Sequence, residues 1–119
     1  MPSVIPVTLP AEAELVPCHY VADVTDGDPA EREYVYFAAP DGRLTIGFWE
    51  AQPYTERITS YPGDEFCQVL RGQVTLTGTD GTTHSFGEGS SFTVPAGWAG
   101  EWRVDQPFMK YFALSIPPA

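Results

Sequence analysis

The sequence predicts an all-β protein, a sandwich or a barrel, folded as a single domain. Its 119 residues suffice for one hydrophobic core but are short for two. Twelve prolines and eleven glycines argue against long helices, and only the stretch between Pro62 and Pro95 escapes interruption by proline. Short runs with the two-residue alternation of strands are separated by glycine turns. The central strands should therefore lie within residues 62–95.

The charge of the chain excludes several classes of partner. The formal net charge is −10; residues 1–41 contribute −7, from eight acidic residues against Arg32, and the remainder −3, from eight acidic against five basic residues. Binding to phosphates needs clustered lysine and arginine. We therefore expect neither a nucleic-acid partner nor an anionic membrane partner.

Cysteine usage and apolar runs bear on location. Cys18 and Cys67 allow at most one internal disulfide, which excludes a secreted domain held by several bridges. No run approaches the roughly 20 apolar residues of a membrane span, and the opening MPSVIPVTLP lacks a basic stretch and is broken by prolines. We expect a cytoplasmic protein.

The first third of the chain should contribute edges and loops. Residues 1–20 hold short β-like runs broken by prolines, which suits an edge strand or an arm. His19, with no other ligand at suitable spacing, is expected to be exposed or to cap a turn. Residues 23–33 are acidic and rich in turn formers, so we expect a loop there. A calcium loop is the alternative, but Asp23, Asp26 and Asp28 do not meet the required spacing.

Two strands then surround a turn. Residues 34–38 and 44–50 flank Pro40-Asp41-Gly42, a hairpin signal. On the second strand both faces are substantially apolar, with Phe48 on one and Trp49 on the other, so we expect both to be covered. Residues 54–61 should form the next strand, with faces Thr55, Arg57, Thr59, Tyr61 and Tyr54, Glu56, Ile58, Ser60.

The central stretch starts at a turn, Tyr61-Pro62-Gly63-Asp64. A strand from Glu65 would place Glu65, Cys67 and Val69 on one face and Phe66, Gln68 and Leu70 on the other. Arg71-Gly72 is predicted to form the next turn, and Asp80-Gly81 the turn of a hairpin between residues 72–79 and 82–86.

The last third should contribute two inward faces. Trp98, Gly100 and Trp102 alternate on one face after the proline-glycine turn at residues 95–97. Residues 108–116 form a strand on which Lys110, the only lysine, shares a face with Phe108, Phe112 and Leu114. A buried ammonium needs a partner, because burying an isolated charge is costly.

These spacings resemble those of a known family. Glu65, six residues and Gly72, followed later by Gly89, five residues and Pro95-Ala96-Gly97, resemble the two motifs of the cupins, small β-barrels of jelly-roll type. The Glu65/Cys67 pair, Trp102 and Lys110 resemble the cupins of (S)-ureidoglycine aminohydrolase type. The resemblance covers residues 44–114. It implies an N-terminal arm and first hairpin strand over residues 1–43 and a barrel core over residues 44–119.

The sequence departs from the metal-binding cupins at three positions. Where those proteins carry histidines beside the glutamate, this chain has Thr59, Tyr61 and Gly100, so only Glu65 remains of the four ligands. A lone carboxylate cannot hold a transition metal tightly. We therefore expect no tightly bound metal cofactor.

The same positions predict a pocket for a small molecule. If Thr59 and Tyr61 occupy the former ligand positions they point inward, and Arg57 follows by the same alternation. A few polar groups in a barrel interior suit the wall of a ligand site. Gly100, between Trp98 and Trp102, would leave room for a planar part of the ligand. The alternative is that the tryptophans simply fill the barrel.

The charged residues suggest chemistry. Glu65 could act as general acid or base, with Arg57 or Lys110 holding an anionic group of the substrate. Alternatively, Glu65 forms a buried ion pair that only stabilises the fold. Cys67 could be a nucleophile, but no histidine in the predicted pocket would activate it, so we expect a buried apolar thiol.

Two classes of function stay open at this point. One is an enzyme, such as a hydrolase, lyase or isomerase, that acts on a small polar or anionic metabolite without a metal. The other is a non-catalytic small-molecule binding protein. A metal-dependent ureidoglycine aminohydrolase is a further alternative, although it needs the missing histidines. Because such relatives are commonly homodimers and Phe66 and Leu70 face outward, we also expect a homodimer whose N-terminal arm lies across the partner.

Overall fold

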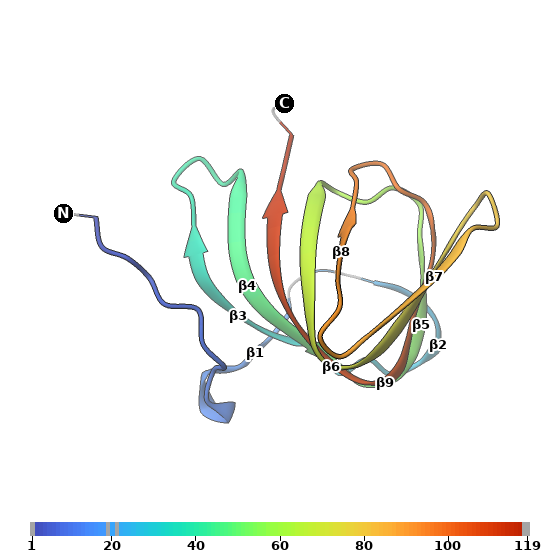
Figure 1. Cartoon of the computed structure of the whole chain (residues 1–119), viewed down its shortest axis with the longest axis horizontal. Helices are drawn as coiled ribbons and strands as arrows, with labels where there is room; N and C mark the ends of the chain where they lie inside the picture. Colours follow the sequence, from blue (N-terminus) through green and yellow to red (C-terminus); the bar gives the residue numbers. More distant parts are fainter. Residues whose placement is uncertain (1, 19, 21, 118–119) are drawn as a thin grey trace.

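The chain folds into one curled β-sheet, which confirms the predicted all-β class (Figure 1). The computed structural model describes residues 2–18, 20 and 22–117. His19, predicted from the sequence to be exposed or to cap a turn, lies outside the described residues. The elements are a single 3-10 turn, η1 (Glu12–Glu14), and the strands β1 (Val16–Pro17), β2 (Asp23–Gly27), β3 (Arg32–Ala38), β4 (Leu44–Ala51), β5 (Tyr54–Ile58), β6 (Asp64–Gly78), β7 (Thr83–Gly87), β8 (Ser91–Val94) and β9 (Gly100–Ser115).

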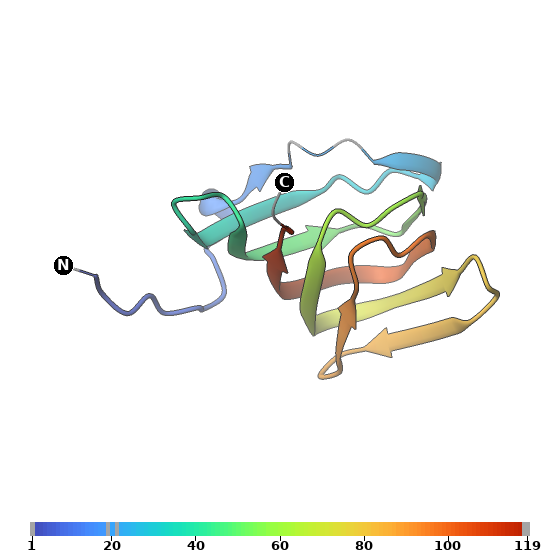
Figure 2. The ribbon, with the colours of Figure 1, turned by 90° about the horizontal axis from the view of Figure 1, so that it is seen from above.

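Two long antiparallel strands, β6 and β9, organise the sheet. They pair along their whole length, from Asp64 opposite Ser115 to Gly78 opposite Gly100. The other edge of β9 pairs first with β5 and then with β4, and β6 carries β7 and β8 on its far side. The long strands bend, so the sheet curls into a half-barrel with a concave inner face (Figures 1 and 2).

The predicted turn at Arg71-Gly72 is wrong, because β6 continues through it. The pairing of β6 with β9 changes register on both sides of Arg71, which marks a bulge inside one strand. Gly72 has φ +83°, and a Cβ there would lie 2.1 Å from the carbonyl oxygen of Pro107. Glycine is therefore required at this bend. The predicted hairpins at Gly42 and Gly81 are present, joining β3 to β4 and β6 to β7.

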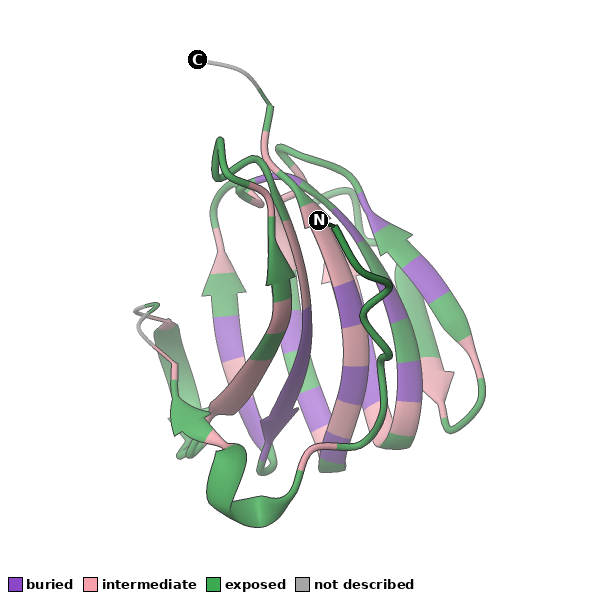
Figure 3. Ribbon diagram, turned by 90° about the vertical axis from the view of Figure 1, so that its left-hand side faces the viewer, coloured by how far each residue is buried: buried purple, intermediate pink, exposed green. Residues whose placement is uncertain are grey.

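The alternation predicted from Glu65 onward is confirmed. Glu65, Cys67 and Val69 are buried on the concave face, whereas Phe66 on the opposite face is 50% exposed. The same two-residue banding runs along the central strands in Figure 3. On β9, Phe108, Lys110 and Phe112 are buried on the concave face as predicted. Most of the hydrophobic core therefore lies inside the curl, on the face that also holds the ionisable residues.

The convex face of the sheet is covered in part by aromatic rings, and the N-terminal arm is hydrogen-bonded to it. Phe48 on this face and Trp49 on the concave face are both buried, which confirms that both sides of β4 are covered. The Phe48 ring lies against Tyr111, and Tyr111 against Tyr36. The Tyr36 hydroxyl donates to the carbonyl oxygen of Thr8 at 2.6 Å. Through this bond the arm is fastened to the outside of the sheet.

The predicted loop over residues 23–33 is wrong at both ends. Residues 23–27 form β2, which pairs with β5 at the edge of the sheet, and β3 begins at Arg32. All five residues of β2 are exposed. A solvated edge strand shows no alternation of apolar and polar residues, so its composition resembles that of a loop.

Within the part of the chain that the structure describes, no helix has the length and apolar character needed to cross a membrane.

Candidate functional site

A cavity of about 450 Å³ opens on the concave face. That size falls within the range of small-molecule sites. Its walls come from β4, β5, β6 and β9, and it is also lined by Cys18, Tyr20, Asp23 of β2 and Glu33 of β3. Aromatic and ionisable side chains share these walls, among them Trp49, Tyr61, Trp102, Glu56, Glu65 and Lys110.

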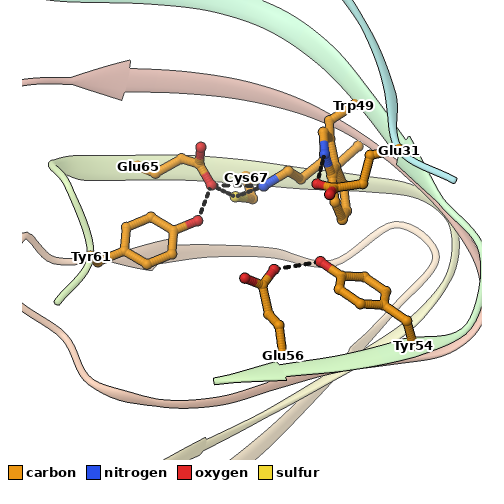
Figure 4. Close-up of polar contacts among 8 residues, drawn as sticks. Glu31, Trp49, Tyr54, Glu56, Tyr61, Glu65 and Cys67 are labelled. Carbon is orange, nitrogen blue, oxygen red and sulfur yellow. Dashed lines mark hydrogen bonds and ion pairs between the residues drawn. The ribbon is translucent and has the colours of Figure 1, made fainter. Parts of the chain in front are cut away.

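Three donors converge on one oxygen of Glu65. Its Oε1 accepts hydrogen bonds from the Lys110 ammonium at 2.7 Å, the Tyr61 hydroxyl at 2.7 Å and the Cys67 thiol at 3.1 Å. The alternation of β6 directs Glu65 and Cys67 inward, and Figure 4 shows Tyr61 and Cys67 directed at Glu65. Lys110 comes from the neighbouring strand β9, where it pairs with Val69. The predicted convergence of Glu65 and Lys110 is therefore present.

Lys110 is buried among aromatic rings. Its Nζ lies 5.0 Å from the ring centre of Trp49, 4.9 Å from that of Trp102 and 5.6 Å from that of Phe112. A cation within about 6 Å of an aromatic face is attracted by the ring quadrupole. The ammonium thus has both an ionic partner in Glu65 and three aromatic contacts, which together offset the cost of burying it.

The environment fixes the protonation states of this group. Burial raises the pKa of Glu65, but the charge of Lys110 and the hydrogen bonds from Lys110, Tyr61 and Cys67 outweigh it and hold the pKa below its ordinary value. Burial lowers the pKa of Lys110, yet attraction to Cys67 and Glu65 raises it to about 12. Burial raises the pKa of the Cys67 thiol to about 12. At neutral pH the group is a carboxylate, an ammonium and a thiol.

A second buried carboxylate, Glu56, lies on β5. It is 4% exposed. Its Oε1 accepts a hydrogen bond from the Tyr54 hydroxyl at 2.5 Å and its Oε2 one from the Tyr20 hydroxyl. Burial and the Glu56 charge raise the pKa of both tyrosines, so both hydroxyls remain protonated donors at neutral pH. Figure 4 shows Glu56 and Tyr54 across from Glu65 and Tyr61.

Glu31 adds a third carboxylate to the same region. Its Oε1 accepts a hydrogen bond from the indole nitrogen of Trp49 at 3.0 Å. Burial raises the pKa of Glu31, the bond from Trp49 lowers it, and the charge of Glu56 raises it. The effect of the Glu56 charge on Glu31 indicates that these two carboxylates concentrate negative charge in this part of the structure.

The predicted inward position of Arg57 is wrong. Its side chain is 66% exposed and forms an ion pair with Asp23 of β2 at 3.0 Å, at the cavity mouth. Strand β5 ends at Ile58, and residues 59–60 bend before Tyr61. The alternation therefore cannot be extended from Tyr61 back to Arg57. Thr59 is exposed at the mouth, and the inward residues of β5 are Tyr54, Glu56 and Ile58.

Glu56 was missed by sequence reasoning. A signal was present, because Tyr54 and Ile58 make its face of β5 the more apolar one. The apolar face of a half-buried strand normally points to the core. That rule would have selected Glu56 over Arg57 as the inward charge.

The space expected at Gly100 is absent. A Cβ on Gly100 would lie 2.2 Å from the carbonyl oxygen of Thr77 and 2.8 Å from the Trp98 ring. Glycine is therefore needed here for close backbone packing, and it opens no room for a ligand. Trp98 packs against Tyr61 with ring centres 6.4 Å apart, whereas only Trp102 of the two tryptophans lines the cavity described above.

Trp102 contributes its ring more than its N–H group. Its indole nitrogen is buried and has no hydrogen-bond partner among the described residues. An unpaired buried donor costs about 1–3 kcal/mol. The ring contacts with Lys110, Trp49, Tyr61 and Phe92 are what this side chain supplies to the cavity.

The residues at the former metal positions do not fit a metal. Thr59 is exposed, Gly100 has no side chain, and the Tyr61 hydroxyl donates to Glu65. The Lys110 ammonium already lies against the remaining ligand, Glu65. No group of three or more His, Cys, Asp or Glu suited to a metal ion occurs among residues 2–18, 20 and 22–117. That no metal is tightly bound stays a prediction.

Comparison with known proteins supports the fold. No curated protein matches the chain. Among solved structures, the EutQ protein of Clostridium difficile is 19% identical with a TM-score of 0.62, covering 89% of this chain and 79% of its own. A cupin superfamily protein from Desulfitobacterium hafniense is 17% identical, with a TM-score of 0.59 and coverages of 73% and 78%.

A third structure covers nearly the whole chain. The acetylacetone dioxygenase of Acinetobacter johnsonii is 9% identical with a TM-score of 0.70, covering 97% of this chain and 76% of its own. At such identities these likenesses establish the fold alone. The model of the EutQ-like cupin domain family matches residues 38–112, more than half of the chain. The protein therefore belongs to the EutQ-like cupin domain family.

Proposed function

We propose that this protein binds a small polar metabolite in the concave cavity. The supporting observation is the cavity itself, about 450 Å³ with aromatic walls and a few oriented polar groups, Glu56, Tyr61 and Glu65 among them. Sites for small molecules have this composition, in which apolar walls supply affinity and the polar groups fix orientation.

Binding without catalysis agrees best with the protonation states. A general base or acid works best with a pKa near the working pH. Here the pKa of Glu65 is lowered and those of Lys110 and Cys67 are raised to about 12. The carboxylate is then a weak base, the ammonium a weak acid and the thiol a poor nucleophile at neutral pH.

A metal-independent acid–base enzyme is the second candidate. It is favoured by the position of Glu65 and Lys110, since both line the cavity and would reach a bound molecule. In that case the substitution Glu65→Gln abolishes turnover. Wild-type turnover in this variant would eliminate Glu65 as the general acid or base. The likeness to cupins of (S)-ureidoglycine aminohydrolase type stays a prediction, and the side chains at Thr59, Tyr61 and Gly100 give no support to its metal-dependent reaction.

A metabolite screen by thermal shift tests the proposal, with product analysis of every hit to separate a binder from an enzyme. The decisive variant is Ile58→Trp, which fills the cavity from its β5 wall. The matched control is Ser91→Trp, at an exposed position of β8. Hits that bind the control but not Ile58→Trp support the proposal. Hits that bind Ile58→Trp as tightly as the wild type contradict it.

A homodimer is part of the proposal. The homodimer is supported by large apolar side chains that are exposed in the single chain, namely Phe66 and Phe37 on the sheet and Val4 and Leu9 on the arm. Exposed apolar patches of this kind commonly mark interfaces. Sedimentation at micromolar concentration should give the mass of two chains, and a single-chain mass would contradict this.

A cytoplasmic location is proposed too, supported by the free thiols of Cys18 and Cys67.

A further inference from the structure

Glu56 is a buried charge without a cationic partner among the described residues. Both of its oxygens accept hydrogen bonds, but the donors, Tyr20 and Tyr54, are neutral. The ion pairs of the described chain occupy Arg32, Arg57, Arg103 and Lys110 with other acids. Hydroxyl donors reduce the cost of burying a carboxylate without neutralising it. The charge of Glu56 is therefore left for something else to balance.

The basic groups that line the cavity do not balance it. Lys110 lies 2.7 Å from Glu65, and Arg57 lies 3.0 Å from Asp23. Each of these pairs is neutral as a unit. With Glu56 added, the cavity has an excess of negative charge, and Glu31 lies near enough for the charge of Glu56 to raise its pKa. An anionic guest would meet repulsion here, contrary to the anionic group expected from the sequence.

The walls already accommodate an ammonium. The Nζ of Lys110 lies within cation–π contact distance of the ring centres of Trp49 and Trp102. Further rings, Tyr20 and Tyr61, line the same cavity. Aromatic rings beside an unneutralised carboxylate form the kind of surface that binds organic cations.

We propose that the cavity selects a guest that carries an ammonium group. The ammonium binds Glu56, and the apolar part of the guest lies against the aromatic walls. Selectivity follows from the charge of Glu56, because a neutral guest gains only the apolar contacts and an anionic guest loses energy to repulsion. This inference rests on the proposed binding function and names the class of molecule bound.

Three probes of nearly the same shape test the inference by calorimetry at neutral pH and low salt. They are 2-phenylethylamine, 2-phenylethanol and 3-phenylpropanoate, which carry a positive, a neutral and a negative group on one ring. We expect the amine to bind roughly tenfold more tightly than the alcohol, the effect of one charge-assisted hydrogen bond. The acid should bind most weakly of the three.

Glu56→Gln identifies the responsible residue. The glutamine amide can still accept a hydrogen bond from one tyrosine hydroxyl and donate one to the other, so two hydrogen bonds are kept while the charge is removed. Affinity for the amine should fall roughly tenfold and affinity for the alcohol should not change. The matched control is Glu88→Gln, which removes the same charge at an exposed turn outside the cavity and should leave all three affinities unchanged.

The outcomes separate this inference from the proposed function. Equal affinities for the three probes, tightest binding of the acid, or no saturable binding of the amine overturn the inference, and because the ranking is measured on the wild type it does not depend on any variant folding. Unchanged amine affinity in Glu56→Gln overturns it too. If the probes bind Ile58→Trp as tightly as the wild type, the proposed cavity function fails instead.

Discussion

Glu65 and Glu56 are both buried carboxylates in one cavity, and both accept a hydrogen bond from a tyrosine. They differ in what else surrounds them. Glu65 has the Lys110 ammonium at 2.7 Å, and Lys110 in turn is surrounded by three aromatic rings. Glu56 has a second tyrosine where Glu65 has an ammonium. One carboxylate is internally neutralised and the other is not.

That difference separates a stabilising role from a binding role. A buried ion pair whose charges satisfy one another has little attraction left for a guest. A buried charge with neutral donors keeps its attraction for a cation. We therefore expect changes at the Glu65 pair to appear mainly in the free energy of unfolding. Changes at Glu56 should appear mainly in ligand affinity.

The largest expected effect is the loss of Lys110. Lys110→Met keeps most of the side-chain volume but leaves the Glu65 carboxylate buried without a cation. Removing one partner of a buried pair costs about 3–5 kcal/mol. Urea unfolding at neutral pH measures the loss.

The double variant Lys110→Met/Glu65→Gln is its control. It removes both charges, so most of the lost stability should return. A double variant as unstable as Lys110→Met alone would mean that the aromatic contacts of Lys110, and not its pairing with Glu65, stabilise the fold.

The pH dependence of stability should be the next largest effect. The pKa of Lys110 is raised to about 12 from an ordinary 10.5, so its contribution, about 2 kcal/mol, is complete below pH 10.5 and is lost as pH rises towards 12. The pKa of Glu65 is lowered in the folded protein, so its contribution to stability is present above pH 4.5. That contribution is lost as the pH falls through the pKa of Glu65 in the folded state.

Other groups titrate in the same ranges, so the measurement is a difference. Urea unfolding across pH is compared between the wild type and Lys110→Met/Glu65→Gln. The free energy of unfolding of the wild type minus that of the double variant should be constant at intermediate pH. It should fall at both acid and alkaline extremes. A difference that stays constant from acid to alkaline pH would show that the two groups titrate alike in folded and unfolded chains.

The smallest effect on stability is expected at Glu56. Glu56→Gln removes an unneutralised buried charge while the tyrosine hydrogen bonds are kept, so the free energy of unfolding should stay within about 1 kcal/mol of wild type or rise. Chemical unfolding at neutral pH checks this. A loss as large as that of Lys110→Met would mean that Glu56 is itself neutralised in the fold and would erase the contrast with Glu65.

The strands that were predicted well are those with an unambiguous burial pattern. Glu65, Cys67 and Val69 alternate with Phe66, Gln68 and Leu70 in a stretch free of proline, and one face is buried as expected. The pairing of Glu65 with Lys110 could also be predicted from the sequence, because a lysine buried among phenylalanines on a strand needs an anionic partner.

The errors have a common physical origin in backbone irregularity. Alternation was extended through residues 59–60, where the chain bends, and this exchanged Arg57 for Glu56 as the inward charge. The bulge at Gly72 was taken for a turn because both use a glycine with positive φ. Strand β2 was taken for a loop because an exposed edge strand carries no burial pattern. Local sequence does not encode the bulge or the edge strand, since tertiary pairing decides them, whereas the more apolar face of β5 could have identified Glu56 as the inward charge.

Carboxyl ¹³C NMR during titration with 2-phenylethylamine tests the contrast between the two carboxylates most directly, with the signals assigned from Glu56→Gln and Glu65→Gln. We predict that the Glu56 carboxyl signal shifts saturably with added amine, while the Glu65 signal stays close to its starting position. A shift of Glu65 with Glu56 unchanged, or no saturable shift of either, would contradict the division into a neutralised pair and a free charge.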